Sequence, residues 1–192
     1  MSISKKIKKL LDDNKISYKA IKHKTVYTAH DMASTMKARL DDVLKTVVIK
    51  TDKDHIMVVV PASFLLDLKK LAKVLKAKKV QIAQEGVMKE LFKVEPGNIA
   101  PFAIHEVPIL ADKAVAKMKK VLARAGSYED SVELKAKDWL AVAGATMADI
   151  GKKMAKAASK AAAKQRKSGK TGKPKAKSAS KAKKSKPKNK KR

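Results

Sequence analysis

DVLKTVVIK (residues 42–50) and HIMVVVPA (residues 55–62) are two apolar, β-branched runs separated by the polar stretch TDKD. Two such runs that flank a short polar turn predict a β-hairpin whose strands lie in a core. Lys45 lies at the front of the first run, immediately before Thr46. A cation at this position has two interpretations. Either its ammonium reaches water at the rim of the strand, or the charge is directed at a ligand.

The segments on both sides of this hairpin alternate between helical and strand patterns. Apolar residues recur at helical spacing from Ile3 to Leu11, and Thr28 with Asp31 three residues later approximates a capping box. We expect helices at 3–11, 28–36, 67–75, 87–92, 114–121 and 137–144, and strands at 16–21, 44–50, 55–62, 78–83, 107–112, 121–125, 131–134 and 146–150. This order predicts an α+β fold class: a single domain with a central mixed, barrel-like β-sheet flanked by helices.

Positive charge is concentrated at the C-terminal end. The 192 residues include 47 Lys and Arg and 18 Asp and Glu, which give a formal net charge of +29. Residues 152–192 hold 19 of the basic residues and no acidic one, so they carry +19 and residues 1–151 carry the other +10. We therefore expect one domain at 1–151, followed by a Lys/Ala/Ser/Pro-rich tail at 152–192.

The tail has the composition of a disordered segment. Residues 168–192 contain Pro, Gly and Ser but no apolar residue larger than alanine. Such a segment cannot bury enough apolar surface to offset the entropy cost of ordering, so we expect disorder. A block of one charge sign is typical of an interaction arm, and we expect it to bind RNA or DNA non-specifically through phosphate groups. The alternative is a segment that only improves solubility.

Several classes of site are missing from the sequence. There is no cysteine, which excludes a thiol nucleophile and a thiolate metal site. No Gly-x-Ser-x-Gly, His-Glu-x-x-His or P-loop pattern occurs, and the four histidines show no ligand spacing. We expect no metal and no cofactor. Because no secretory signal and no apolar run of about 18 residues is present, we expect a cytoplasmic protein without a membrane partner.

The loop EPGNIAPF (residues 95–102) is restricted by two prolines and contains Gly97. Glycine lets the backbone approach a ligand closely, and a rigid loop can present its carbonyl and N–H groups to a small polar molecule. The alternative is an ordinary rigid connector between a helix and a strand.

Taken together, these segments resemble one family, the YbaK-type aminoacyl-tRNA deacylases. This family includes free-standing relatives of the editing domain in bacterial prolyl-tRNA synthetase. The resemblance covers roughly residues 1–150. The order and approximate spacing of the family are matched by HKTVYTAHDMA (23–33), DVLKTVVIK (42–50), MVVVPAS (57–63), PGNIAPF (96–102) and AGSYEDSVEL (125–134).

The resemblance implies roles for individual residues. Lys45 matches the family's essential lysine, which favours the second interpretation of this cation and implies a catalytic role. Gly97 and Pro101 match a Gly-x-x-x-Pro loop whose backbone lines the aminoacyl pocket. Two departures leave the pocket shape open, because many relatives have Thr-Gly at Phe92-Lys93 and glycine at Ala103. The set that the resemblance implies for substrate binding is Tyr27, Thr46, Gly97, Asn98, Ile99, Ala100, Pro101 and Gly126.

The resemblance implies a trans-editing hydrolase that deacylates mischarged aminoacyl-tRNA. The expected substrate is tRNA for proline that carries a small amino acid, and prolyl-tRNA synthetase is a candidate partner. An aminoacyl ester needs a positioned water and a stabilised oxyanion more than a strong nucleophile, which fits the missing nucleophile–base motif. The alternative is a non-catalytic nucleic-acid-associated protein with the same fold and a histone-like basic tail.

Overall fold

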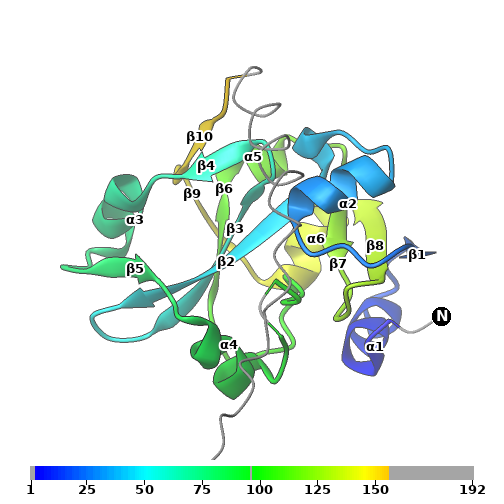
Figure 1. Cartoon of the computed structure of the whole chain (residues 1–192), viewed down its shortest axis with the longest axis horizontal. Coiled ribbons are helices and arrows are strands. Elements are labelled where there is room, and N and C mark those ends of the chain that lie inside the picture. Colours follow the sequence, from blue (N-terminus) through cyan, green and yellow to red (C-terminus); the bar gives the residue numbers. More distant parts are fainter. Residues whose placement is uncertain (1–2, 96, 156–192) are drawn as a thin grey trace, which may run out of the picture.

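The computed structural model describes residues 3–95 and 97–155 (Figure 1). The helices are α1 (Lys5–Asp13), α2 (Ala29–Thr35), α3 (Leu68–Leu75), α4 (Glu85–Phe92), α5 (Lys113–Ala116) and α6 (Ala136–Ala143), with a 3₁₀ turn at η1 (Leu40–Asp42). The strands are β1 (Tyr18–Lys22), β2 (Leu44–Thr51), β3 (His55–Pro61), β4 (Phe64–Leu66), β5 (Val80–Ile82), β6 (Ile109–Asp112), β7 (Lys120–Arg124), β8 (Asp130–Lys135), β9 (Thr146–Ala148) and β10 (Gly151–Lys153). The expected α+β class is confirmed.

The strands form three sheets within the described residues. The largest has the order β5-β2-β3-β6-β9 and is mixed, because β2 pairs antiparallel with β3 and β5 whereas β6 pairs parallel with β3 and β9. The second is antiparallel with the order β1-β8-β7. The third is a two-stranded antiparallel ribbon of β4 and β10. In Figure 1 the five-stranded sheet occupies the left and centre and the three-stranded sheet the right.

The expectation of one barrel-like sheet is wrong. The five-stranded sheet ends at β5 and β9, which do not pair with each other, so it is not closed. The second sheet approaches β2 at one isolated bridge, Val43 to Leu122. A closed barrel needs continuous pairing around its circumference, and a single bridge leaves the two sheets as separate layers.

The predicted hairpin of β2 and β3 is confirmed, and both of its faces are buried. Met57 and Val59 of β3 face the main core, between the two larger sheets and α6. Val58 and Val60 face a second cluster that α3 covers with Leu71. Because side chains alternate along a strand, burial on both faces requires the continuous apolar run that the sequence shows.

The predicted capping box at Thr28 is also confirmed. The Thr28 side chain accepts from the Asp31 N–H, and the Asp31 carboxylate accepts from the Thr28 N–H, at 3.1 and 3.2 Å. By contrast, the helix expected at 114–121 ends at Ala116. The chain from Lys120 onward pairs with β8 instead, so tertiary pairing overrides the helical pattern of alanine, lysine and methionine.

The ribbon of β4 and β10 is held by Asp112 at the end of β6. The Asp112 carboxylate is 3% exposed and accepts from the N–H groups of Ala114, Ile150 and Gly151, at 2.7, 3.0 and 2.7 Å. A Cβ atom on Gly151 would lie 2.8 Å from Cδ1 of Phe64 and 3.1 Å from Oδ2 of Asp112, so a larger residue there would displace the Phe64 ring or the Asp112 carboxylate. These contacts turn the chain after β9 and bring β10 beside β4.

The boundary between domain and tail was predicted at residue 151, and strand pairing continues slightly beyond it. Lys152 and Lys153 pair with β4, and the Met154 N–H donates to the Ser63 carbonyl at 2.9 Å. The remainder of the segment predicted to be disordered, residues 156–192, lies outside the described residues.

We predict that Asp112→Asn strongly destabilises the fold. The amide replaces one acceptor oxygen with an NH₂ group that faces backbone donors, and a buried unsatisfied group costs about 1–3 kcal/mol. The free energy of unfolding, measured in urea, should fall by about 2 kcal/mol or more. The control is Asp149→Asn, which removes an exposed ion pair to Lys70 (2.9 Å) and should cost less than about 1 kcal/mol. Equal losses in the two variants would contradict the proposed role of Asp112.

Candidate active site

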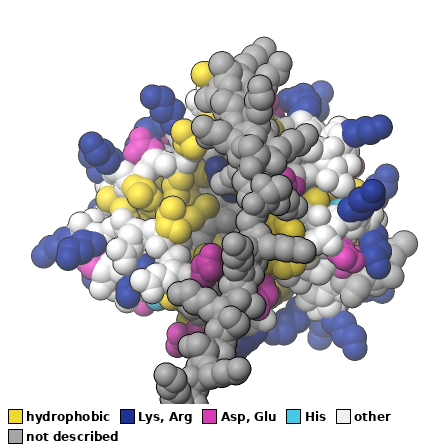
Figure 2. Space-filling view, viewed as in Figure 1, with side chains coloured by type: hydrophobic (Ala, Val, Ile, Leu, Met, Phe, Trp, Pro, Cys, Tyr) yellow, Lys and Arg dark blue, Asp and Glu magenta, His cyan; other side chains and the backbone are white. Residues whose placement is uncertain are grey.

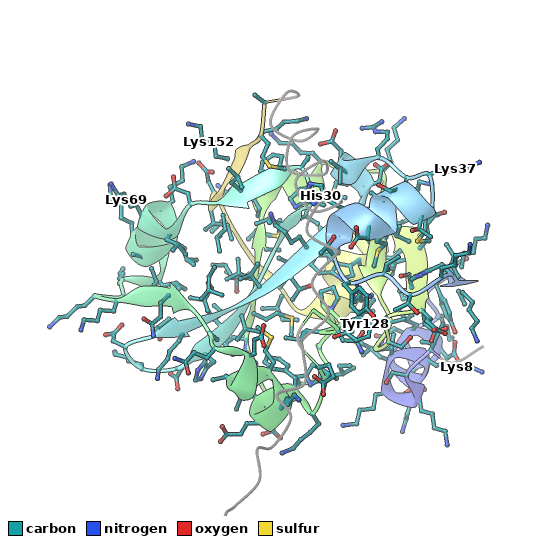
Figure 3. The ribbon with its side chains drawn as sticks, in the orientation of Figure 1. Lys8, His30, Lys37, Lys69, Tyr128 and Lys152 are labelled. Atoms are coloured by element: carbon teal, nitrogen blue, oxygen red, sulfur yellow. The ribbon has the colours of Figure 1, made fainter. Side chains whose placement is uncertain are left out.

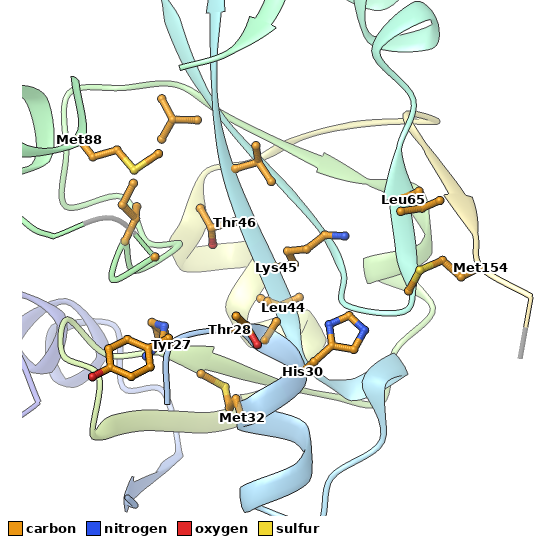
Figure 4. Close-up of a pocket in the computed structure, with 16 residues that line it drawn as sticks. Tyr27, Thr28, His30, Met32, Leu44, Lys45, Thr46, Leu65, Met88 and Met154 are labelled. Carbon is orange, nitrogen blue, oxygen red and sulfur yellow. The ribbon is translucent and has the colours of Figure 1, made fainter. Parts of the chain in front are cut away.

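A cavity of about 380 Å³ opens beside β2, at the place where both larger sheets, the β4–β10 ribbon and α2 meet (Figure 4). Its walls come from segments far apart in the sequence. They are the approach to α2, the first half of β2, strand β4, helix α4, the loop after α4 and the ends of β7 and β10. The lining residues are Tyr27, Thr28, Ala29, His30, Met32, Leu44, Lys45, Thr46, Val47, Val48, Leu65, Met88, Gly97, Ile99, Arg124 and Met154.

Lys45 reaches this cavity from the second position of β2. Leu44 and Val48 belong to the main core, and Val47 packs against the second cluster, so Lys45 lies on the face opposite to Leu44. The half-buried Lys45 side chain donates from Nζ to the Phe64 carbonyl oxygen of β4. The Phe64 carbonyl therefore orients the Lys45 ammonium at the cavity wall.

The loop after α4 closes one side of the cavity and is held at both ends. Gly97 has φ +81°, and a Cβ atom there would lie 3.1 Å from the Tyr27 carbonyl oxygen. The fully buried Trp139 donates from Nε1 to the Pro101 carbonyl at 2.8 Å, and Asn98 donates from Nδ2 to the Gly126 carbonyl at 3.2 Å. These bonds make the loop a fixed wall.

The residues proposed from the sequence divide into two groups. The structure brings five of them to the cavity lining: Tyr27, Lys45, Thr46, Gly97 and Ile99. Four others lie behind this lining: Asn98, Ala100, Pro101 and Gly126. Asn98, Ala100 and Pro101 are buried, and Asn98 donates to the Gly126 carbonyl, which joins the loop to the turn between β7 and β8.

Arg124 is a lining residue that sequence reasoning missed. Its guanidinium donates to the Val26 carbonyl at 2.8 Å and to the Ser127 carbonyl at 3.3 Å, and it lies 5.4 Å from the centre of the Tyr128 ring. Burial lowers the pKa of Arg124, but an arginine remains charged at any physiological pH. In the sequence, the only feature that marks Arg124 is that it is the single cation in the apolar stretch VLARA (residues 121–125).

His30 is the second lining residue that the sequence did not single out. It lies in the first turn of α2, and Figure 4 shows its ring pointing toward the region between Lys45 and Met154. An imidazole can accept or donate a proton near neutral pH, which no other side chain in the described lining does at its ordinary pKa. The only signal in the sequence was its place two residues after the helix cap at Thr28.

The electrostatics of the described lining favour an anion. It contains the cations Lys45 and Arg124 and no carboxylate. Most of the remaining wall is apolar, which strengthens the field of these cations because little water is there to screen it. The arrangement can therefore hold a phosphate or stabilise an oxyanion beside an apolar pocket.

One nucleophile–base pair forms on folding but is closed to substrate. Ser131 and His23 are 2.8 Å apart (Oγ to Nε2), and the other ring nitrogen of His23 is 2.8 Å from the Lys24 carbonyl. Ser131 is 0% exposed and also contacts the sulfur of Met32 at 3.7 Å. A buried hydroxyl cannot reach a substrate, so this pair joins β1 to β8 and is structural.

Two further kinds of feature do not occur in the part of the chain that the structure describes. Within residues 3–95 and 97–155, no three His, Cys, Asp or Glu side chains gather in a way that could hold a metal ion. In the same residues, no helix is both long and apolar enough to cross a membrane.

The family model for the aminoacyl-tRNA editing domain matches residues 23–142. The chain belongs to this family. The match includes Tyr27, Lys45, Arg124 and the loop after α4, and every lining residue of the cavity except Met154 lies within it.

Individual relatives are similar at low identity. The prolyl-tRNA editing protein ProX of Acetoanaerobium sticklandii is 29% identical over 110 residues, which are 54% of this chain and 67% of ProX. The proline–tRNA ligase of Staphylococcus saprophyticus is 27% identical over 109 residues, 57% of this chain but only 19% of the ligase. A crystal structure of a candidate trans-editing enzyme for prolyl tRNA synthetase covers 79% of this chain and 98% of its own, with a TM-score of 0.68 and 20% identity, and shares the fold.

We predict that Gly97→Ala displaces the loop, whereas Gly86→Ala does not. Alanine at Gly97 adds a left-handed backbone penalty of about 1 kcal/mol and crowds the Tyr27 carbonyl. The free energy of unfolding should fall by about 1 kcal/mol or more. A Cβ atom on Gly86, in α4, would meet nothing within 4 Å, so alanine there should be neutral or stabilising. A Gly97→Ala protein as stable as wild type would show that the loop is not held against Tyr27.

Proposed function

We propose that the protein is a trans-editing hydrolase that removes a small amino acid from mischarged tRNA, with tRNA for proline as the favoured substrate. The observation that carries the proposal is one cavity in which the Lys45 ammonium, the backbone of the loop at Gly97 and an apolar wall face the same space. Membership of the editing-domain family and the similarity to ProX support it.

The reaction proposed for this cavity is hydrolysis of an activated ester. Water attacks the carbonyl carbon, the bond to the ribose oxygen breaks, and the products are a free amino acid and a tRNA with a free 3′ end. Lys45 either neutralises the terminal phosphate or stabilises the oxyanion, and in both cases its charge must be held in place before the reaction. The bond to the Phe64 carbonyl supplies that preorganisation.

The proton must pass from the attacking water to the leaving ribose oxygen. Two groups can assist: the neighbouring ribose hydroxyl of the substrate, or the His30 imidazole in the lining. Neither needs an activated serine or cysteine, in accord with the closed environment of Ser131.

The apolar wall supports a small aliphatic amino acid as the group removed. Met32, Met88 and Ile99 line the cavity, and methionine fills irregular space without a fixed shape. A pocket of this kind discriminates by only about 1–3 kcal/mol per methylene, so we expect a preference among amino acids and not absolute selectivity.

The basic tail supports tRNA as the carrier of that amino acid. Met154 lines the cavity, and the basic residues from 156 onward follow it closely in the sequence. A polycation tethered there raises the effective concentration of a phosphate backbone near the site. The same tail supports the alternative, a nucleic-acid-associated protein without catalysis, and the two are separated by whether any ester is hydrolysed.

We predict that the protein hydrolyses at least one mischarged small-residue aminoacyl-tRNA and that Lys45→Ala lowers this turnover about a hundredfold or more. A charge placed at a developing oxyanion is typically worth about 3–4 kcal/mol. Lys45→Arg should not restore activity, because a planar guanidinium has a different shape. Turnover is measured with a panel of mischarged tRNAs, and correctly charged prolyl-tRNA should remain mostly intact.

The control for Lys45 is Lys50→Ala, at the exposed end of the same strand. It should leave turnover unchanged. If no tRNA of the panel is hydrolysed above the uncatalysed rate, the proposal that the protein is an enzyme is contradicted. Near-normal activity of Lys45→Ala combined with earlier unfolding would mean that Lys45 is structural.

We predict that deletion of residues 156–192 weakens tRNA binding in a salt-dependent way. The deletion removes 17 of the tail's 19 positive charges and leaves Lys152 and Lys153 in β10. At low salt the apparent KM should rise, because released counterions drive this part of the binding. Turnover at saturating substrate should change little, since the tail binds ground state and transition state equally. Equal salt slopes for both proteins would rule out an electrostatic arm.

A further inference from the structure

A basic groove runs along the side of the molecule formed by α5, β7 and β1. Its first part is a cavity of about 550 Å³ with Arg39, Lys117, Lys119, Lys120 and Lys153 in its walls. Its second part, of about 360 Å³, shares Lys120 with the first. We call the two parts together the basic groove.

The second part adds three more lysines, from β1 and the segment after α2. They are Lys19, Lys22 and Lys37. Because Lys120 lines both parts, the two concavities adjoin at this residue and together carry eight cations.

The three carboxylates in the groove are already neutralised. Arg39 lies 3.6 Å from Asp41 and 3.7 Å from Asp42, and Lys153 lies 3.3 Å from Asp41. The third carboxylate, Glu133, lies 2.8 Å from Lys120.

Five cations of the groove remain without a carboxylate within 4.0 Å among residues 3–95 and 97–155. They are Lys19, Lys22, Lys37, Lys117 and Lys119, and all five are exposed. Exposed ammonium groups at salt-bridge distance from no carboxylate keep their charge available to an anionic partner.

Positive charge alone does not distinguish this groove from the rest of the surface, because Figure 2 shows Lys and Arg side chains on several sides of the molecule. Figure 3 shows, for example, Lys69 projecting on the side opposite to Lys37. The groove differs because its cations line a concavity. Charges on facing walls of low-dielectric material add their fields in the space between them, which isolated lysines on a convex surface do not do.

The β4–β10 ribbon is the wall between the groove and the candidate active site. Phe64 and Lys153 line the groove, whereas their chain neighbours Leu65 and Met154 line the cavity that holds Lys45. Successive side chains of a strand point to opposite faces, so the groove and the cavity lie on opposite faces of this two-stranded ribbon. A molecule whose end enters the cavity can therefore pass over this ribbon and continue along the groove.

We propose that the basic groove binds the phosphate backbone of the base-paired RNA stem whose single-stranded 3′ end enters the active-site cavity. The inference rests on the proposed function for the identity of the RNA. The groove reads no bases: lysine ammonium groups contact phosphate as point charges, so the contact fixes the position of the stem and not its sequence.

The test compares Lys37→Glu/Lys119→Glu, which changes one lysine in each part of the groove, with Lys69→Glu/Lys73→Glu on α3. Both variants of the full chain lower the net charge equally, and all four lysines are exposed. Two measurements are made. The first is binding of an RNA hairpin that has a 3′ overhang and carries no amino acid, across a salt titration. The second is hydrolysis of an aminoacylated CCA trinucleotide, which lacks any stem.

The groove variant should bind the hairpin about tenfold or more weakly at low salt. Its slope of log Kd against log salt should fall by about 2, because two phosphate contacts are lost. Trinucleotide hydrolysis should equal that of wild type, and the α3 variant should match wild type in both measurements.

Equal losses of hairpin affinity in the groove and α3 variants would overturn the inference, because net charge alone would then explain binding. Preferential binding of a DNA duplex of the same length over the hairpin would overturn the assignment to RNA. If the wild-type protein hydrolyses neither the aminoacylated CCA trinucleotide nor any mischarged tRNA of the panel, the proposed function is refuted, yet the hairpin comparison still tests the groove.

Discussion

The carboxylate of Asp112 is the constraint on which the site depends. Three backbone N–H groups, from the start of α5 and from the corner between β9 and β10, converge on this one buried side chain. Because the corner is fixed, β10 pairs with β4, and because β4 is fixed, the Phe64 carbonyl is in place to orient Lys45. A residue with no place in the cavity lining thus sets the direction of the cation in it.

A second set of contacts fixes the opposite wall of the cavity. Arg124 binds the Val26 carbonyl and so holds the backbone just before Tyr27, while Gly97 packs against the Tyr27 carbonyl from the loop side. Trp139 holds the other end of the same loop through the Pro101 carbonyl. The cavity walls are therefore held by side chains that donate hydrogen bonds to backbone carbonyls. One of these donors, Trp139, is not a lining residue, so the shape of the cavity also depends on residues outside its lining. These contacts hold the wall without any bound substrate, which is the kind of preorganisation that the proposed catalysis requires.

The local features of the chain could be predicted because short stretches encode them. The hairpin of β2 and β3 follows from two β-branched runs around a polar turn, and the cap of α2 follows from Thr28 and Asp31. Lys45 and Gly97 were noticed because each breaks a local pattern, a cation entering a core strand and a glycine in a loop of prolines, and the family resemblance then implied their roles. Both lie at the cavity.

What could not be predicted depends on contacts between distant segments. Whether a sheet closes is decided by its edge strands, and the strand pattern of β5 and β9 carries no information about their partners. Strands β4 and β10 have only three residues each, which is too short for a clear strand pattern. Lys152 and Lys153 were assigned to the basic tail because a long run of lysines follows them. Asn98 stands in the right loop, but its side chain points to the Gly126 carbonyl, a direction that residue spacing does not reveal. Arg124 looked like one more cation among 47 until its carbonyl partners were visible.

The position of the ribbon also explains how so basic a chain can keep a selective site. Non-specific attraction by 47 cations would bring any polyanion to the surface, with an affinity that salt controls. The cavity admits only what fits between the loop at Gly97 and the wall at Tyr27, and its walls are mostly apolar. Under the proposed function, charge on the outside raises the local concentration of nucleic acid, and shape on the inside decides which end of it is held. Because the two surfaces lie on opposite faces of the ribbon, the proposed role of the outer charges is to strengthen binding without entering the cavity and without competing with Lys45 for the substrate.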